Sequence, residues 1–199
     1  MGIIGLAVVA AYLIGAIPFA LVVGKGLRGV DVREHGSGNL GTTNAFRTLG
    51  KQVGILVLIG DITKGSLAAG LGLWAGGPEW GILTGIVAVF GHVFPVYARF
   101  RGGKGIATGA GAFVVLFPQA FLVGALLFAG TLLFTRYVSL ASLMGALGIG
   151  LGALFLGYDG LSLGAIWLVV LFVYFTHRAN IGRLLKGQER KANLFEKKK

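Results

Sequence analysis

The sequence predicts an all-α, polytopic membrane protein, and three observations support this fold class. Of the 199 residues, 55% are hydrophobic and only 13% are charged, and the mean hydropathy is +0.83. A soluble domain of this length could not bury so much apolar surface. Most of the chain lies in apolar stretches long enough for helical crossings, without the two-residue alternation of a membrane β-barrel. We therefore expect one integral-membrane domain over residues 1–199.

Turn signals and basic residues divide the apolar sequence into spans. The first basic residue is Lys25, so the first apolar run is expected to be a retained span and not a cleaved signal peptide. The long run from Ile106 is interrupted by Phe117-Pro118-Gln119, where proline removes a helix donor. We expect seven transmembrane helices, at about residues 3–23, 53–74, 80–96, 106–117, 119–135, 137–157 and 161–176.

The distribution of lysine and arginine predicts the orientation of these spans. Basic residues follow the first, third and last spans, and such loops face the cytoplasm in bacterial membrane proteins. If the run from residue 106 to 135 were one span, the basic loop after residue 176 would lie outside. A break within that run returns this loop to the cytoplasm. We therefore expect the N-terminus outside and the C-terminus in the cytoplasm. The net charge of +11 is explained by these loops and anionic lipid, without nucleic acid.

The polar stretch Gly36–Gly50, GSGNLGTTNAFRTLG, is predicted to hold an anion. Its glycines allow backbone N–H groups to turn toward one point. Thr42 or Thr43 could cap a helix whose N-terminus favours negative charge, with Asn44 and Arg47 on one face. The G-x-G-x-x-G pattern is not a dinucleotide fingerprint, because a membrane-length helix and not a strand precedes it. The alternative is a glycine-rich turn between two spans.

A second candidate anion site is the stretch Arg101-Gly102-Gly103-Lys104-Gly105. It is not a P-loop, because no serine or threonine follows the lysine. The glycines could present backbone amides and Lys104 a point charge to a phosphate, at the start of a helix. The alternative is an interfacial lysine that reaches toward the headgroups.

A third polar stretch begins at the end of the last span. His177 and Asn180 share a face if the helix continues, and Arg183 follows two turns on. Histidine can hold or relay a proton near neutral pH. The alternative is a basic helix end that meets lipid headgroups. Glu189 either pairs with a nearby cation or is a solvated charge.

Several polar residues occur within or at the ends of the spans. Asp61 and Lys64 are three residues apart and can form an ion pair, with a functional or a stabilising role. His92 is as compatible with an interfacial histidine as with a reactive one. Ser142 lies near the cytoplasmic end of a span, where serine usually bonds its own helix backbone. We expect no metal site, because the three histidines are scattered, and the absence of cysteine excludes thiolate chemistry.

Taken together, these stretches resemble a known family. GSGNLGTTNAFR, GHVFPVYARFRGGKGIAT and HRANIGRLLKGQE, in this order, are similar to the three signature motifs of the bacterial acyl-phosphate-dependent glycerol-3-phosphate acyltransferases. The resemblance implies a seven-helix enzyme of the bacterial inner membrane with its active site on the cytoplasmic face. The implied reaction converts acyl phosphate and glycerol 3-phosphate to lysophosphatidic acid and phosphate, the first acylation of phospholipid synthesis.

The resemblance also implies roles for individual residues. The acyl-phosphate headgroup is assigned to Ser37, Gly38, Asn39, Gly41, Thr42, Thr43, Asn44, Gly102 and Gly103. Glycerol 3-phosphate is assigned to Arg47, Lys104, Ser142, His177 and Asn180, of which all but Ser142 are also the expected catalytic residues. Supporting roles are expected for Asp61, Lys64, His92 and Glu189. The expected partners are the two substrates and membrane lipid, with no cofactor, metal, nucleic acid or obligate protein partner.

Two questions are left open by the sequence. The base that deprotonates the attacking hydroxyl is either His177 or a substrate phosphate, and we favour the phosphate because the loops carry few carboxylates. The alternative function is a transporter or channel for phosphorylated anions, which a broken helix and polar loops also suit. Against it, the polar groups gather at one face and the chain has no convincing internal repeat.

Overall fold

The computed structural model describes residues 2–192, and all regular elements in this range are helices, which confirms the all-α prediction. The chain forms two compact units, an N-terminal unit up to Phe117 and a C-terminal unit from Pro118 onward. The helices of the N-terminal unit are α1 (Gly2–Ala16), α2 (Phe19–Arg28), α3 (Thr42–Leu49), α4 (Lys51–Gly76), α5 (Pro78–Val93) and α6 (Ile106–Leu116). The C-terminal unit contains α7 (Pro118–Thr135), α8 (Val138–Phe155), α9 (Gly160–Thr176) and α10 (Arg178–Leu185).

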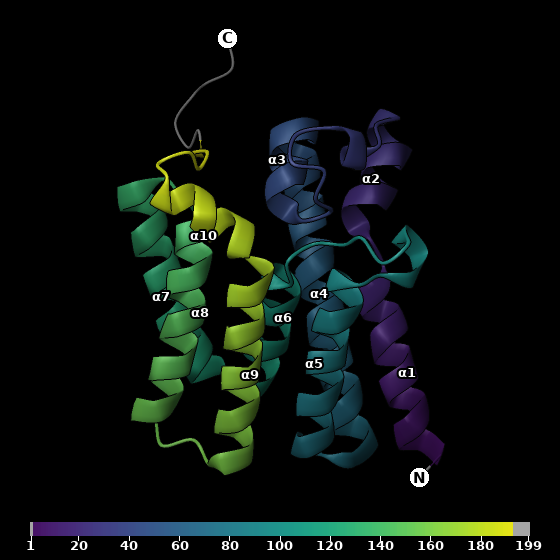
Figure 1. Ribbon diagram of the computed structural model, residues 1–199. Coiled ribbons are helices and arrows are strands. Elements are labelled where there is room, and N and C mark those ends of the chain that lie inside the picture. The colour runs from purple at the N-terminus through teal and green to yellow at the C-terminus, as the bar shows by residue number, and fades with distance from the viewer. Residues whose placement is uncertain (1, 193–199) are drawn as a thin grey trace. The chain divides into compact units, whose positions relative to one another are not determined.

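Helix α4 is the centre of the N-terminal unit and contacts α1, α2, α3, α5 and α6 (Figure 1). Its contact with α6 is made backbone to backbone. A Cβ atom on Gly65 would overlap the carbonyl oxygen of Thr108, and one on Gly111 would overlap the carbonyl oxygen of Ile62. Small residues allow this close approach, which is a common mode of helix packing in membranes.

Two helix breaks occur at prolines, Pro18 and Pro118. The predicted break at Phe117-Pro118-Gln119 is present, because α6 ends at Leu116 and α7 begins at Pro118. The predicted first span is itself divided, since α1 ends at Ala16 and α2 begins at Phe19 with a bend of 44°. Pro18 lies at this break, and proline disfavours helical conformation in the residue before it.

The lengths of the helices fit several membrane crossings. Within residues 2–192, four helices are long and apolar enough to cross a membrane: α4, α5 with its extension to Ala98, α7 and α8. The number rises to six if the bent pairs α1–α2 and α9–α10 each count as one span. Helix α6 is apolar but has only 11 residues, which corresponds to about 16 Å of helix. The structure is therefore that of a multi-pass membrane protein.

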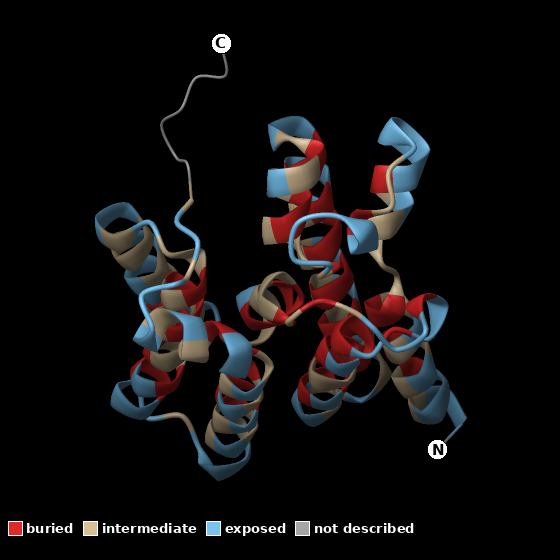
Figure 2. Cartoon of the chain, turned by 45° about the horizontal axis from the view of Figure 1, so that its top comes forward, coloured by how far each residue is buried: buried red, intermediate tan, exposed pale blue. Residues whose placement is uncertain are grey.

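Within the N-terminal unit, α2, α3 and the loop between them lie at the end of α4 that is opposite the α4–α5 turn (Figure 1). Helices α4 and α5 of this unit carry buried residues along their length, and red segments mark buried residues throughout the chain in Figure 2. In the C-terminal unit, α8 packs against α7 and α9, and α10 contacts α8 and α9. The outer face of α7 exposes large apolar side chains, including Leu126 and Phe134, as expected of a surface that faces lipid.

Candidate active site

The first loop, Gly36–Gly41, is shaped by one buried asparagine of α3. The Oδ1 atom of Asn44 accepts a hydrogen bond from the backbone N–H of Ser37 at 2.9 Å. Its Nδ2 atom donates to the carbonyl oxygens of Val32 at 3.0 Å and His35 at 3.1 Å. Both amide hydrogens are therefore used within the protein, and Asn44 is only 2% exposed. Asn44 holds the loop in shape.

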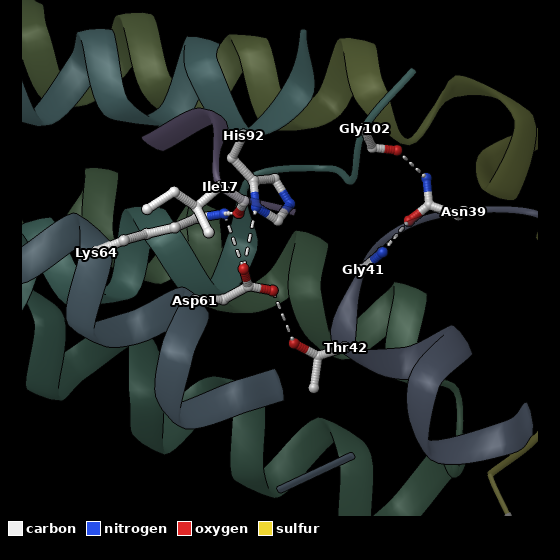
Figure 3. A network of polar contacts seen from close by, with 8 residues as sticks. All are labelled: Ile17, Asn39, Gly41, Thr42, Asp61, Lys64, His92 and Gly102. Carbon is white, nitrogen blue, oxygen red and sulfur yellow. Dashed lines mark hydrogen bonds and ion pairs between the residues drawn. The ribbon is translucent and has the colours of Figure 1, made fainter. Parts of the chain in front are cut away.

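The second loop, Arg101–Gly105, lies directly against the first. The side-chain amide of Asn39 donates to the carbonyl oxygen of Gly102 at 3.1 Å, and its Oδ1 accepts from the N–H of Gly41 at 2.9 Å (Figure 3). A Cβ atom built on Gly41 would lie 3.9 Å from the Cα of Gly103. The structure therefore brings two of the three polar stretches together, although they are about sixty residues apart in the sequence.

The glycines of the second loop serve close packing. We expected their amides to face a phosphate, but the N–H of Gly102 donates to Val93 O and that of Gly103 to His92 O, both at 3.1 Å. Any Cβ on Gly103 would overlap the imidazole of His92. These two positions need glycine because the loop lies against the end of α5, and their amides are already used there.

Free backbone donors are instead provided by the start of α3. Thr42 and Thr43 occupy its first turn, where a helix leaves N–H groups without intrahelical partners and favours an anion. Ser37 and Gly38 are exposed beside this turn in the first loop. Arg47 is exposed one turn further along α3, and Lys104 is half-buried immediately before α6. The N-terminal unit thus carries backbone donors at the start of α3 and basic side chains at Arg47 and Lys104.

Charged groups are buried below the two loops. Asp61 and Lys64 of α4 have side chains only 1% and 2% exposed, and Lys64 Nζ lies 2.9 Å from Asp61 Oδ1. The ammonium also donates to the carbonyl oxygen of Ile17 at 2.8 Å. His92 Nδ1 lies 3.5 Å from the same Asp61 oxygen (Figure 3). The predicted Asp61–Lys64 pair is confirmed, and His92, also buried, belongs to the same cluster.

In the C-terminal unit, the backbone determines how His177 is protonated. His177 lies between α9 and α10 and is 3% exposed. Its Nδ1 atom is 2.9 Å from the carbonyl oxygen of Val173. Because a carbonyl oxygen can only accept, Nδ1 carries a proton, and a neutral His177 then has an acceptor at Nε2. His177 can donate from Nε2 only as the imidazolium.

Glu189 gathers three donors at the end of α10. Its Oε1 accepts from Asn180 Nδ2 at 2.7 Å and from Ser139 Oγ at 3.1 Å, and its Oε2 accepts from Arg183 Nε at 2.7 Å. Partial burial alone would raise the pKa of Glu189, but these hydrogen bonds and the Arg183 charge hold it below its ordinary value. Glu189 is therefore paired with a cation and is not a solvated charge. The Glu189 carboxylate therefore links α10 to the start of α8. Ser142, one turn further along α8, donates a hydrogen bond to Val138 O of its own helix.

We expect Glu189→Gln to destabilise the protein by about 1–3 kcal/mol, because an amide cannot replace a carboxylate that accepts three donors. The wild-type contribution is present above the ordinary pKa of 4.5 and is lost as the pH falls through the lowered value. Thermal unfolding in detergent, measured from neutral to acidic pH, tests both points. Glu34→Gln, at an exposed site, is the control. Equal midpoints for the two variants would contradict the expected role.

The structure therefore tests the predicted site in part. The residues of the first two stretches meet in the N-terminal unit, and those of the third stretch lie with Ser142 in the C-terminal unit. The sequence offered a cation partner for Glu189, which Arg183 provides, but it did not predict the hydrogen bond of Glu189 with Ser139 or the contact of Thr42 with Asp61 at 3.4 Å. In the part of the chain that the structure describes, no group of three or more His, Asp or Glu side chains could hold a metal ion.

The comparisons with known proteins agree with the sequence motifs. The glycerol-3-phosphate acyltransferase family model matches residues 5–187. The glycerol-3-phosphate acyltransferase of Bacillus cytotoxicus is 49% identical over 194 residues, which cover 98% of each chain. The enzyme of that name from Geobacillus kaustophilus is 46% identical over 91% of this chain and 92% of its own.

Solved structures show the same similarity. A crystal structure of PlsY (YgiH), an integral membrane glycerol 3-phosphate acyltransferase, in its glycerol 3-phosphate form has a TM-score of 0.91 and 38% identity over 96% of each chain. The lysophosphatidic acid form of that protein has a TM-score of 0.88 and 38% identity over 94% of each chain. By motif, sequence and fold, this integral membrane protein belongs to the glycerol-3-phosphate acyltransferase family.

Proposed function

We propose that this protein transfers a fatty acyl group from acyl phosphate to the 1-hydroxyl of glycerol 3-phosphate. The products are lysophosphatidic acid and inorganic phosphate. The observation that supports this most strongly is the hydrogen bond from Asn39 to Gly102 O, which joins the first loop, beside the start of α3, to the second loop with its Lys104. Two phosphorylated substrates need cations and backbone donors of the kind that these segments carry. Membership of the family and the glycerol 3-phosphate form of the related structure support glycerol 3-phosphate as the acceptor.

The acyl-phosphate headgroup binds at the first loop and the start of α3. The backbone N–H groups of Thr42 and Thr43, with Ser37, donate to the phosphate oxygens, where the helix dipole favours negative charge. Asn39, Asn44, Gly38 and Gly41 shape the loop around it, and Gly102 and Gly103 hold the second loop against it. This assignment keeps the predicted residues and gives several of them a positioning role.

We assign glycerol 3-phosphate to Arg47, Lys104, Ser142, His177 and Asn180, as the sequence motifs imply. Arginine and lysine give charge-assisted hydrogen bonds to phosphate, and the imidazolium form of His177 adds a third cation. Glu189 keeps Asn180 in place. With both substrates bound, the reaction gains from the proximity of the hydroxyl to the acyl carbonyl.

The chemical step needs no covalent acyl-enzyme. The glycerol oxygen forms a bond to the carbonyl carbon, and the bond from that carbon to the bridging phosphate oxygen breaks. The leaving phosphate takes the electron pair of that bond. The hydroxyl proton passes to a substrate phosphate, whose second pKa of about 6 suits a base at neutral pH.

The topology that we propose has seven crossings, with the N-terminus outside and the C-terminus and the site at the cytoplasmic face of the bacterial inner membrane. Six of these crossings are α4, α5, α7, α8 and the two bent pairs α1–α2 and α9–α10. The seventh is the short helix α6. With about 16 Å of helix, α6 requires cover from neighbouring helices, and its backbone contact with α4 provides it.

The acyl donor is tested with two substrates that carry the same chain, palmitoyl phosphate and palmitoyl-coenzyme A. Each is offered to the purified protein in detergent with glycerol 3-phosphate, and lysophosphatidic acid is measured. We expect product from palmitoyl phosphate alone. Product from the thioester alone would overturn the proposed donor. Glycerol 3-phosphate flux into liposomes without product from either donor would support the transporter alternative instead.

A further inference from the structure

The buried carboxylate of Asp61 contacts Thr42 at the start of α3 and His92 of α5, against which the second loop packs. On one side, Thr42 Oγ1 in the first turn of α3 donates to Asp61 Oδ2 at 3.4 Å (Figure 3). On the other side, His92 Nδ1 lies 3.5 Å from Asp61 Oδ1. The backbone of Gly103 lies against the opposite edge of the same imidazole, so closely that a Cβ there would overlap His92 Nε2.

The contact with Asp61 determines what Thr42 can offer a ligand. A carboxylate oxygen can only accept, so the hydroxyl hydrogen of Thr42 points toward Asp61. While this contact is made, the hydroxyl cannot donate to a phosphate, and the backbone N–H remains the donor of this residue. At 3.4 Å the hydrogen bond is long, as catalytic hydrogen bonds often are before substrate binds.

Stability alone does not account for charges at this depth. Replacing a buried ion pair with well-packed apolar residues is often neutral or stabilising, and a charge within a membrane helix is costly. Lys64 Nζ lies 2.9 Å from Asp61 Oδ1 and offsets its charge. The same ammonium donates a hydrogen bond to Ile17 O. The carboxylate therefore needs a reason beyond packing, and its contacts with Thr42 and His92 supply one.

We propose that Asp61 is a positioning residue for the acyl-phosphate half of the site. It holds the first turn of α3 through Thr42 and supports the second loop through His92, while Lys64 neutralises its charge. This inference rests on the proposed function. It assigns Asp61 to the acyl donor and not to glycerol 3-phosphate, so its loss raises the KM for acyl phosphate selectively.

A double-mutant cycle tests the proposal through initial rates with palmitoyl phosphate and glycerol 3-phosphate. Thr42→Val removes the hydroxyl, and Asp61→Leu/Lys64→Met removes the acceptor and its counterion together. We expect each change to raise the KM for palmitoyl phosphate about tenfold and to leave the KM for glycerol 3-phosphate unchanged. In the triple variant, Thr42→Val should have no further effect, because its partner is already absent. Thr42→Ser, which keeps the hydroxyl, should restore the wild-type KM.

The control is Thr48→Val, since the Thr48 hydroxyl bonds its own helix at Asn44 O and faces neither substrate in the proposed site. If the effects of Thr42→Val and Asp61→Leu/Lys64→Met multiply in the triple variant, Thr42 acts on the substrate directly and the proposal is wrong. Equal increases in both KM values would also overturn it. If the Asp61→Leu/Lys64→Met protein does not fold, the proposal is tested with the Thr42 variants alone. The KM for palmitoyl phosphate must then rise in Thr42→Val and equal the wild-type value in Thr42→Ser. A wild-type protein that makes no lysophosphatidic acid would refute the proposed function itself.

Discussion

Replacing Gly65 with alanine is expected to destabilise the protein and to remove most of its activity. Gly65 lies in α4 where the backbone of α6 passes, and an added Cβ would overlap the carbonyl oxygen of Thr108. Backbone cannot yield as a flexible side chain does, so the two helices must separate. Overpacking of this kind typically costs about 1–3 kcal/mol, and more where backbone is the obstacle. Because α6 follows the second loop directly, the shift also displaces that loop.

The matched control for Gly65→Ala is Gly70→Ala in the same helix. A Cβ on Gly70 meets nothing within 4 Å. Alanine is preferred over glycine inside a helix by roughly 0.5–1 kcal/mol, so this variant should keep or slightly raise the unfolding midpoint. Thermal unfolding and acyl transfer in the same detergent are the measurements. If Gly65→Ala matched Gly70→Ala in both, the close contact of α4 and α6 would not be a determinant of this fold.

Replacing His177 with alanine is expected to lower kcat/KM for glycerol 3-phosphate by about 100-fold, mainly through a higher KM. The bond from Nδ1 to Val173 O fixes the orientation of the imidazole ring, and the expected loss follows from the role proposed for this ring in binding glycerol 3-phosphate. Initial rates at varied concentrations of glycerol 3-phosphate measure kcat and KM separately in the wild type and in His177→Ala.

A general base at His177 would give the opposite result, a loss of kcat with an unchanged KM for glycerol 3-phosphate. His177→Ala would keep its affinity for substrate but lose turnover at every pH. His35→Ala is the control, because His35 is exposed and has no role in the proposed site. Initial rates over a range of glycerol 3-phosphate concentrations and pH values distinguish the two mechanisms.

The parts of this structure that the sequence predicts are those that depend on local chemistry. The break at Pro118 follows from the missing N–H of proline, and the Asp61–Lys64 pair follows from a spacing of three residues on a helix. The division of the first span at Pro18 has the same cause, but it was not predicted because the surrounding residues form an uninterrupted apolar run.

Other features depend on tertiary contacts that spacing cannot reveal. Glycine allows both amide donation and close packing, so the pattern of Gly102-Gly103 did not indicate that α5 would accept both N–H groups. Thr42 meets Asp61 across 19 positions, and Ser139 meets Glu189 across 50. The direction of a side chain over such separations is set by how the helices pack, which a single sequence does not show.

The central claim, that acyl phosphate and glycerol 3-phosphate react directly on this protein, is tested most directly by a mass balance. Purified protein is incubated with palmitoyl phosphate and glycerol 3-phosphate, and inorganic phosphate and lysophosphatidic acid are measured in the same samples. The account predicts that both appear in equal amounts and that neither is released when glycerol 3-phosphate is omitted. Phosphate released without lysophosphatidic acid would show hydrolysis in place of transfer and would contradict it.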